Sequence, residues 1–488
     1  MYQLEVKRSE KIVDFFTLNS DLIKQISKKD IEDLMEMCSY LLGNRNIDEQ
    51  LKSKVLTVLY HIACTDDISL EESWQIYWII KHQLFVSENS TLLKVNLDDL
   101  YGHIFEFLQE YLKIDYPYLK ISERNNDVIV IITSQFLGLN HAPTRRVLDY
   151  SYAIQKELGK KVIIINDAGT NFYRSEHFPN ALYLNYIDQY SHMNMLPYKD
   201  ENFEFLQVGS QMPNVNIIAQ LLKIIYKINP LLVFNIGASS LIADLCSNFT
   251  TTASLPCSHY IPISRSKYLV VARKVDGKDR ERINRIATGQ IIVETVLNYK
   301  FAQHSEIYDR KQFGLSEDSF VIVVVGNRLD DELSMDFLNL LNEINDIEDI
   351  HILFIGGVND IDRIKGGMKN KDKIHFTGHL SGASEAIKLC NLYLNPKRKG
   401  GGRSAFEALH YGIPVITMDV GDVYYVSGSD FSVNNYNEMY DLVKRYYTDA
   451  KFYQEMKIKG INRANELGNI AETQKKMIEE IMRREAKK

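Results

Sequence analysis

The chain has 488 residues, of which 45% are hydrophobic and 25% charged, with a formal net charge of −7 at pH 7. This length predicts two or three domains, and the composition is that of a folded globular protein rather than a disordered or fibrous one. The negative net charge argues against general nucleic-acid binding, which requires an extended basic surface.

Neither the cysteines nor the N-terminus indicates an exported protein. The five cysteines lack paired or metal-ligand spacing, which is typical of buried thiols in a reducing compartment. The first residues contain no apolar signal core, and no run approaches the ~18 apolar residues needed to span a membrane. We therefore expect a cytoplasmic protein and leave open a peripheral association with the inner face of the membrane. The abundance of Lys, Ile, Asn and Tyr is compatible with a bacterial source.

Residues 1 to about 118 carry only helical patterns, in four amphipathic segments. Asp30 is predicted to cap the first segment, and Ser69 with Glu72 to form a capping box for the third. The aromatic residues in 74–78 have helical spacing, which favours core packing over a partner surface. The pattern predicts a small all-α domain, through which homo- or hetero-oligomers can form.

From about residue 125 the pattern changes to alternating strands and helices. Continuous apolar runs of this kind are typical of buried parallel strands. The alternation predicts a doubly wound α/β domain over residues 125–305. The predicted strands cover residues 127–133, 161–166, 231–236 and 268–272.

His141 follows the first of these strands, in the turn that an open α/β sheet uses to bind ligands. A histidine there can bond a ligand or move a proton, and it can equally be held in the turn or cap the next helix. The sequence leaves both interpretations open. Pro143 suits the first turn of that helix.

The domain junction is predicted within residues 277–318. This segment begins with the charged run GKDRERINR, which we interpret as a solvated helix face.

A second α/β domain is predicted over residues 318–465, followed by a C-terminal helix over 466–488 that can cross back to the preceding domain. Its strands are predicted at residues 320–325, 351–356, 373–378, 392–394 and 413–418.

Three consecutive glycines, Gly400, Gly401 and Gly402, lie between the last two of these strands and directly before a predicted helix over 403–410. Glycine has no Cβ, so it can adopt positive φ angles and allow a ligand to approach the main chain. The free N–H groups at the start of the helix favour a negatively charged ligand at the same point. The sequence therefore predicts an anion site here.

Four cations surround this glycine loop: Lys397, Arg398, Lys399 and Arg403. Each can strengthen the binding of an anion by a charge-assisted hydrogen bond. Glu407 lies one helical turn after Arg403 and is expected on the same face. A carboxylate at this place suits a sugar hydroxyl better than a phosphate.

With the EAL, glycine and PVIT that follow, residues 395–418 resemble the nucleotide-sugar-binding signature of GT-B glycosyltransferases, in particular the large retaining family 4 group. The usual form of that signature is E-G-F-G, four residues, then E-A and G-x-P-V. The resemblance implies an α/β fold of two Rossmann-like domains facing a cleft, here preceded by the all-α domain. It also implies a hexosyltransferase of polysaccharide or glycoconjugate biosynthesis. Such an enzyme moves a sugar from a nucleotide diphosphate, expected to be UDP, to a glycan, lipid-linked or protein acceptor without a metal or other cofactor.

Aligned in this way, Glu407 contacts the nucleotide ribose, and the glycine loop with Arg403 and Ser404 holds the diphosphate. The first glutamate of the signature, which usually meets the donor sugar, falls on Lys399. Family likeness favours retention of stereochemistry, but this replacement leaves the sugar and the stereochemical outcome open.

The resemblance extends to the start of the second α/β domain. It implies that Asn327 and Arg328 meet the diphosphate and that Gly378 and His379 lie against the base. The lysine that accompanies the arginine in the family is replaced here by Leu333.

These residues lead to a glycosyltransferase hypothesis in which His141, Arg328 and Glu407 have the catalytic roles. The acidic segment 330–332 and Lys399 keep a second hypothesis open, a non-catalytic accessory subunit that binds acceptor or stabilises a partner glycosyltransferase. A nucleotide-sugar epimerase is a third.

Overall fold

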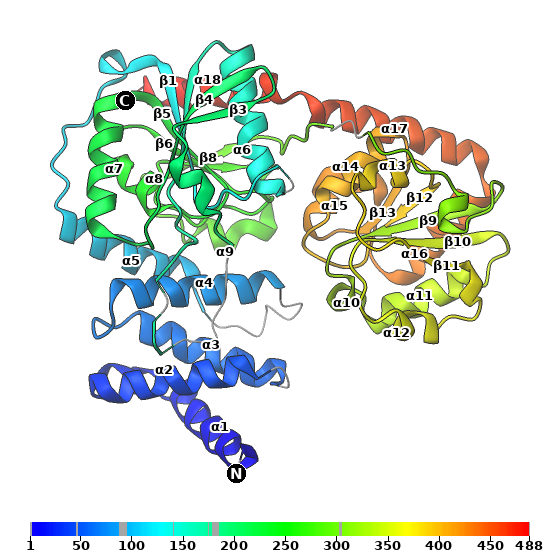
Figure 1. Ribbon diagram of the computed structural model, residues 1–488, viewed down its shortest axis with the longest axis horizontal. Helices are drawn as coiled ribbons and strands as arrows, with labels where there is room; N and C mark the ends of the chain where they lie inside the picture. Colours follow the sequence, from blue (N-terminus) through cyan, green and yellow to red (C-terminus); the bar gives the residue numbers. More distant parts are fainter. Residues whose placement is uncertain are drawn as a thin grey trace. The chain divides into compact units, whose positions relative to one another are not determined.

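A computed structural model describes residues 2–44, 47–86, 95–139, 141–173, 175–177, 185–301 and 305–487 of the chain (Figure 1). The chain divides into two compact units. The first is formed by residues 1–295 together with 474–488, and the second by residues 296–473. Each unit contains one mainly parallel sheet, so the predicted α/β fold with a helical N-terminal region is confirmed.

The N-terminal region consists of helices, as predicted, but contains one more than the four expected. The first helix was missed because Val13 alone among its described side chains is fully buried, so its apolar stripe is weak. The five helices are α1 (Tyr2–Leu18), α2 (Lys28–Gly43), α3 (Glu49–Ala63), α4 (Leu70–Val86) and α5 (Leu97–Leu112).

One of the two predicted caps is confirmed and the other is wrong. The backbone N–H of Glu72 donates to Ser69 Oγ at 3.2 Å, and that of Ser69 donates to Glu72 Oε2 at 3.0 Å. α2, however, is capped by Ser27, whose Oγ accepts from the backbone N–H of Asp30 at 3.2 Å. Asp30 is therefore the third helical residue of a capping box and not the cap itself.

Of the N-terminal helices, α4 and α5 lie nearest to the first sheet and pack against the α/β part of its unit (Figure 1). Trp74 and Tyr77 of α4 are at most 1% exposed, so the prediction of core packing is confirmed. Their polar atoms reach the loops that follow the strands, because Trp74 Nε1 donates to Gly169 O at 2.8 Å and the Tyr77 hydroxyl bonds Ser239 Oγ at 2.7 Å. The helices and the first sheet thus share one core.

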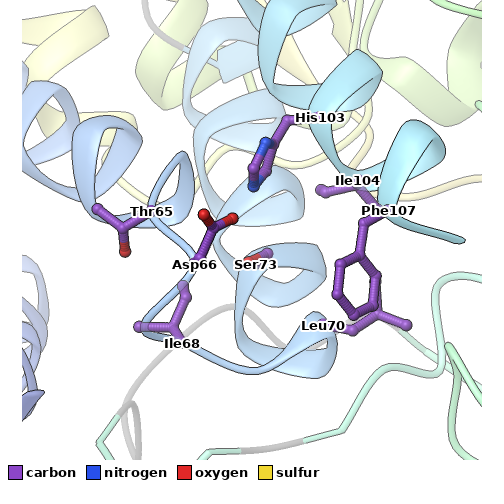
Figure 2. Close-up of a pocket in the computed structure, with 8 residues that line it drawn as sticks. All are labelled: Thr65, Asp66, Ile68, Leu70, Ser73, His103, Ile104 and Phe107. Carbon is purple, nitrogen blue, oxygen red and sulfur yellow. The ribbon is translucent and has the colours of Figure 1, made fainter. Parts of the chain in front are cut away.

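A small cavity of about 50 Å³ lies within the helical region, between α5 and the turn that joins α3 to α4 (Figure 2). Figure 2 shows His103, Ile104 and Phe107 of α5 around it, opposite Thr65 and Asp66. It contains none of the predicted site residues.

The first sheet has the strand order β3-β4-β2-β1-β5-β6-β7-β8. All neighbouring strands are parallel except β3 and β4, an antiparallel pair that the sequence analysis did not predict. The four predicted strands are present as β1, β2, β5 and β7. The strands are β1 (Asn125–Thr133), β2 (Lys161–Asn166), β3 (Met195–Tyr198), β4 (Glu201–Gln207), β5 (Pro230–Ile236), β6 (Thr252–Leu255), β7 (Tyr268–Val271) and β8 (Ile291–Glu294).

Five helices accompany this sheet: α6 (Ala142–Tyr152), α7 (Val215–Ile228), α8 (Leu241–Leu245), α9 (Arg280–Ile283) and α18 (Ile470–Glu485). The end of α18 packs in the first unit, where Glu485 accepts hydrogen bonds from Tyr118 and Thr251. The charged run around α9 is interpreted from the sequence as a solvated helix face. This interpretation is incomplete, because one of its side chains forms a partly buried ion pair. Arg282 pairs with Asp98 of α5 at 2.8 Å, so this run helps to hold the helical region.

The second sheet has the order β11-β10-β9-β12-β13-β14, and all its strands are parallel. Its strands are β9 (Phe320–Val325), β10 (Ile350–Ile355), β11 (Ile374–Phe376), β12 (Leu392–Leu394), β13 (Val415–Met418) and β14 (Ser432–Val433). Its helices are α10 (Leu329–Glu332), α11 (Met335–Asn345), α12 (Ile361–Gly366), α13 (Ala383–Ile387), α14 (Gly402–His410), α15 (Gly421–Ser427), α16 (Tyr436–Thr448) and α17 (Ala450–Gly468). Within the described ranges, no helix combines the length and apolar character that crossing a membrane requires.

The hydroxyl of Tyr101 links α5 to a buried carboxylate of the first unit. It donates to Asp244 Oδ2 at 2.5 Å, and Asp244 also accepts from Ser264 Oγ and from the backbone N–H of Arg265. Tyr101→Phe should lower the free energy of unfolding of the first unit by about 1.5–3 kcal/mol, because a buried acceptor loses one donor. Chemical denaturation measures this loss. Tyr111→Phe is the control, since Tyr111 is 62% exposed, and equal effects of the two changes would contradict the prediction.

Two histidines on neighbouring strands predict that the stability of the second unit depends on pH. His351 Nδ1 lies 2.9 Å from His375 Nε2, so one ring donates and the other must be an unprotonated acceptor. Burial and the neighbouring His351 and Lys365 lower the pKa of His375 from 6.5 to about 4, and burial and Lys373 lower that of His351. Because these folded-state pKa values lie below the unfolded value, their contribution is complete above pH 6.5 and is lost as the pH falls toward 4.

We therefore expect amide hydrogen exchange in β10 and β11 to accelerate between pH 6.5 and 4, after correction for the intrinsic exchange rate. His375→Gln should flatten this dependence, whereas His379→Gln, at an exposed position, should not. An unchanged profile in His375→Gln would show that the pair does not carry the effect.

Candidate functional site

The predicted donor-binding residues gather at the carboxyl edge of the second sheet. Because β9, β10, β11, β12 and β13 are parallel, the loops that follow them meet along this edge. The loops after β9 and β12 carry Arg328 and the glycine loop, and β9 and β12 are hydrogen-bonded neighbours. The fold therefore brings together two motifs that are separated in sequence by β10 and β11.

Arg328 lies beside the first glycine of the loop. A Cβ placed on Gly400 would be 3.9 Å from Arg328 Nη2 and would have no other heavy atom within 4 Å. The Arg328 side chain is 43% exposed and pairs with Glu332 Oε1 at 3.1 Å. Its neighbour Asn327 is exposed. A permanent cation, an open backbone position and a helix N-terminus thus lie close together.

The three glycines have different environments. Gly401 has a φ of +99°, and a Cβ there would be 2.7 Å from Arg398 Nη2. A Cβ on Gly402 would be 2.7 Å from the Tyr299 hydroxyl. Gly401 and Gly402 are therefore required by the packing of the protein itself, and Gly400 is the one of the three with open space beside it.

The sequence pattern places Arg398 among the cations around the glycine loop. In the structure, however, Arg398 is not available to a ligand at the loop surface. Its side chain is 5% exposed. Arg398 Nε donates to Asn395 Oδ1 at 2.8 Å, and Nη2 donates to the carbonyl of Val325 at 2.7 Å. Nη1 pairs with Glu332 at 2.6 Å. The sequence pattern could not reveal this, because the side chain points into the fold from the middle of a basic triplet.

The two remaining cations of the triplet differ. Lys397 is exposed, and Lys399 is partly buried, so that burial lowers the pKa of Lys399. The carbonyl of Lys399 accepts the backbone N–H of Asp422 at 2.8 Å, which ties the loop to the start of α15.

The start of α14 is held by side chains that were predicted to bind the donor. Ser404 Oγ donates to Gly401 O at 3.0 Å and bonds the Tyr393 hydroxyl at 2.8 Å. Arg403 Nε donates to Glu407 Oε1 at 3.1 Å, as their spacing of four predicted, and Arg403 Nη2 donates to Lys300 O at 3.2 Å. Glu407 is 8% exposed. Arg403 and Glu407 thus form a pair at the edge of the site.

The acidic segment after Arg328 is engaged within the unit. The Asp330 carboxylate accepts the backbone N–H groups of Asn359 and Asp360 at 2.8 and 3.0 Å, and these bonds lower the pKa of Asp330. Leu333, where the family lysine would lie, is 2% exposed and packs in the core. Asp330 therefore holds the loop after β10, and its charge does not simply oppose an anion.

The predicted base-contacting residues follow β11 at the same edge of the sheet. Gly378 and His379 are exposed, and Gly378 has a φ of +66°. The carbonyl of Gly378 accepts the backbone N–H of Gly356 at 2.9 Å, which joins the loops after β10 and β11.

His141 belongs to the first unit, at the N-terminus of α6. Its Nδ1 bonds Thr144 Oγ1 at 2.9 Å, and Thr144 Oγ1 also accepts the backbone N–H of Leu137. Burial lowers the pKa of His141 to about 4, so the imidazole is neutral at pH 7. The ring is therefore held in the turn, which is one of the two interpretations of the sequence, and its low pKa makes it a weak proton acceptor at pH 7.

Together, these features indicate a class of protein. Two mainly parallel α/β units, one with an exposed arginine beside a glycine loop at a helix N-terminus, are typical of enzymes that bind a phosphorylated nucleotide at a strand edge.

Sequence comparison identifies the domain that carries this edge. Residues 319–449 match the family model described as glycosyl transferases group 1. No curated protein matches the chain in sequence.

Solved structures extend the comparison to the whole fold. The O-GlcNAc transferase of Thermobaculum terrenum is 11% identical, with a TM-score of 0.52 over 98% of each chain. Anabaena Alr3699/HepE, solved in complex with UDP, is 10% identical, with a TM-score of 0.51 over 72% of this chain and 99% of that one. A glycosyltransferase of Rickettsia africae is 14% identical, with a TM-score of 0.50 over 73% and 99%. The chain therefore has the GT-B fold.

Alanine substitutions can separate the glycine that faces open space from one that packing requires. Gly401→Ala should lower the free energy of unfolding of the second unit by about 1–3 kcal/mol, because a side chain at positive φ is strained. Gly400→Ala should leave that free energy unchanged. Thermal and chemical denaturation of the two variants test the assignment, and similar losses in both would contradict it.

Proposed function

We propose that the chain is a GT-B glycosyltransferase that moves a hexose from a nucleotide diphosphate to an acceptor hydroxyl. The observation that carries the proposal is the placement of Arg328 beside Gly400, next to the N-terminus of α14. The family match and the fold support a glycosyltransferase. We further propose that it acts in the bacterial cytoplasm, in the synthesis of a polysaccharide or glycoconjugate.

The chemistry of the site suits departure of a diphosphate. Negative charge develops on the leaving group as the sugar bond breaks, and groups already aimed at that charge stabilise the transition state without reorganising. Arg328 supplies a guanidinium, while the loop at Gly400 and the start of α14 supply backbone N–H groups. Lys397 and Lys399 add positive charge nearby. This set of donors can neutralise the leaving group without a metal ion.

The remaining donor contacts are assigned by the resemblance and by position. Glu407, held by Arg403, is proposed to bond the ribose, and Gly378 and His379 to contact the base. Since Anabaena HepE was solved with UDP and shares the fold, we propose UDP as the nucleotide. Lys399 stands where the signature usually has a glutamate, so retention is proposed on family likeness alone.

The acceptor is proposed to bind to the first unit, with the neutral imidazole of His141 as a hydrogen-bonding group or proton acceptor. A glycan, a lipid-linked sugar or a protein hydroxyl fits this role. The carboxylates of Asp330 and Glu332 are engaged within the second unit, so they are compatible with donor binding and no longer favour an accessory subunit.

The purified protein should bind one member of a panel of UDP-, GDP- and ADP-sugars and hydrolyse it slowly without acceptor. Isothermal titration calorimetry and product chromatography measure these steps, and chromatography also detects epimer formation. Slow hydrolysis supports the transferase, whereas an epimer without released nucleotide would identify an epimerase. Absence of binding to every donor would favour the accessory subunit.

Two substitutions test the site within this proposal. Arg328→Ala and Glu407→Gln should each weaken nucleotide binding about 10-fold or more, because each removes a charge-assisted hydrogen bond to the ligand. Lys369→Ala, at a surface ion pair with Asp346, is a charge-matched control and should bind as the wild type does. Wild-type affinity in both site variants, with the fold intact by circular dichroism, would refute the assignment.

A further inference from the structure

Glu332 lies between two arginines of different character. Its Oε1 accepts from Arg328 Nη2 at 3.1 Å and its Oε2 accepts from Arg398 Nη1 at 2.6 Å. The Glu332 side chain is 13% exposed, so its charge requires a partner inside the protein.

Of the two arginines, Arg398 is the fixed partner. Its side chain is 5% exposed, and it also donates to the carbonyl of Val325 and to Asn395. Arg328 is 43% exposed and holds Glu332 at the longer distance. Arg328 can therefore turn to a ligand, while Arg398 stays with Glu332.

Two glycines make room for the buried guanidinium. A Cβ on Gly326 would lie 2.6 Å from Arg398 Nη1, and a Cβ on Gly401 would lie 2.7 Å from Nη2. Arg398 Nη2 also bonds the Tyr393 hydroxyl, which bonds Ser404 Oγ. The same guanidinium thus contacts the end of β9, which leads to Arg328, and the glycine loop after β12.

We propose that Arg398 is a positioning residue for the anion site: by neutralising Glu332, it leaves the charge of Arg328 available to the diphosphate. The inference rests on the proposed function, because it assigns a task to the same site. The ion pairs of Glu332 among the described residues are those with Arg398 and Arg328, so without Arg398 its carboxylate keeps the pair with Arg328. The two would pair more tightly, and the ligand would meet a neutral pair instead of a cation.

A double-mutant cycle tests this charge balance. UDP affinity is measured by calorimetry for the wild type, Arg398→Met, Glu332→Gln and the double variant. Arg398→Met should bind UDP at least about 10-fold more weakly, and adding Glu332→Gln should restore the affinity to within about 3-fold of the wild type. A double variant as weak as Arg398→Met would overturn the proposal, because removal of the carboxylate charge should leave Arg328 available to the ligand whether or not Arg398 is present.

Arg310 provides a matched control for loosening of the fold. It donates to the carbonyls of Leu389 and Ser319, and to Asn391, in the same unit. Arg310→Met should lower stability without changing UDP affinity. Equal losses of affinity in Arg310→Met and Arg398→Met would show that Arg398 acts through stability alone, and would also overturn the proposal.

Two further measurements keep the outcome decisive. If Arg398→Met does not fold, Glu332→Gln alone is informative, since it should bind UDP more tightly than the wild type, and equal or weaker binding counts against the proposal. If the wild type binds no nucleotide, the proposed function fails, and the same variants are compared with inorganic pyrophosphate as the probe. Failure of the wild type to bind pyrophosphate as well would overturn both proposals.

Discussion

The burial of one guanidinium organises the carboxyl edge of the second sheet. Arg398 donates to the end of β9, to Asn395 after β12 and to Glu332 of α10, with its side chain 5% exposed. A buried charge is tolerated when its hydrogen bonds are satisfied and a counter-charge lies beside it. Because both conditions are met here, the Arg398 side chain connects the loop after β9 with the glycine loop. This connection places Arg328 beside Gly400.

The same interaction changes the meaning of the acidic segment. Asp330 and Glu332 precede a position at which the glycosyltransferase signature usually has a lysine, and in sequence they weaken the case for an anion site. In the structure, Asp330 accepts backbone N–H groups of the loop after β10, and Glu332 is divided between two arginines. Both carboxylates are engaged in contacts at the edge of the sheet, so the acidic segment is compatible with the predicted anion site.

The helical region is tied to the first sheet by polar contacts as well as by its core. Trp74 and Tyr101 bury their rings and donate to Gly169 and Asp244, which lie on loops and helices of the α/β fold. Amphipathic spacing in 74–78 predicts the burial of Trp74, whereas the burial of Tyr101 is seen in the structure alone. Helical spacing could not predict the hydrogen-bond partners of these two side chains, because the partners lie in segments about 100 or more residues away in sequence. At such a separation, proximity along the chain carries no information.

Local order along the chain was enough to predict the fold class, the buried strands from β1 to β13 that lie in continuous apolar runs, and a glycine loop leading into a helix. These features depend on periodicity and on backbone sterics, which neighbouring residues decide. The sequence pattern missed the weak stripe of α1, the antiparallel pair β3 and β4, and the short strands β6, β8 and β14. The tertiary structure decided which member of the triplet Lys397, Arg398, Lys399 is buried, and which glycine faces open space. Both depend on what β9 and α10 place opposite the loop, and burial of a charge is determined by such partners rather than by the sequence around it.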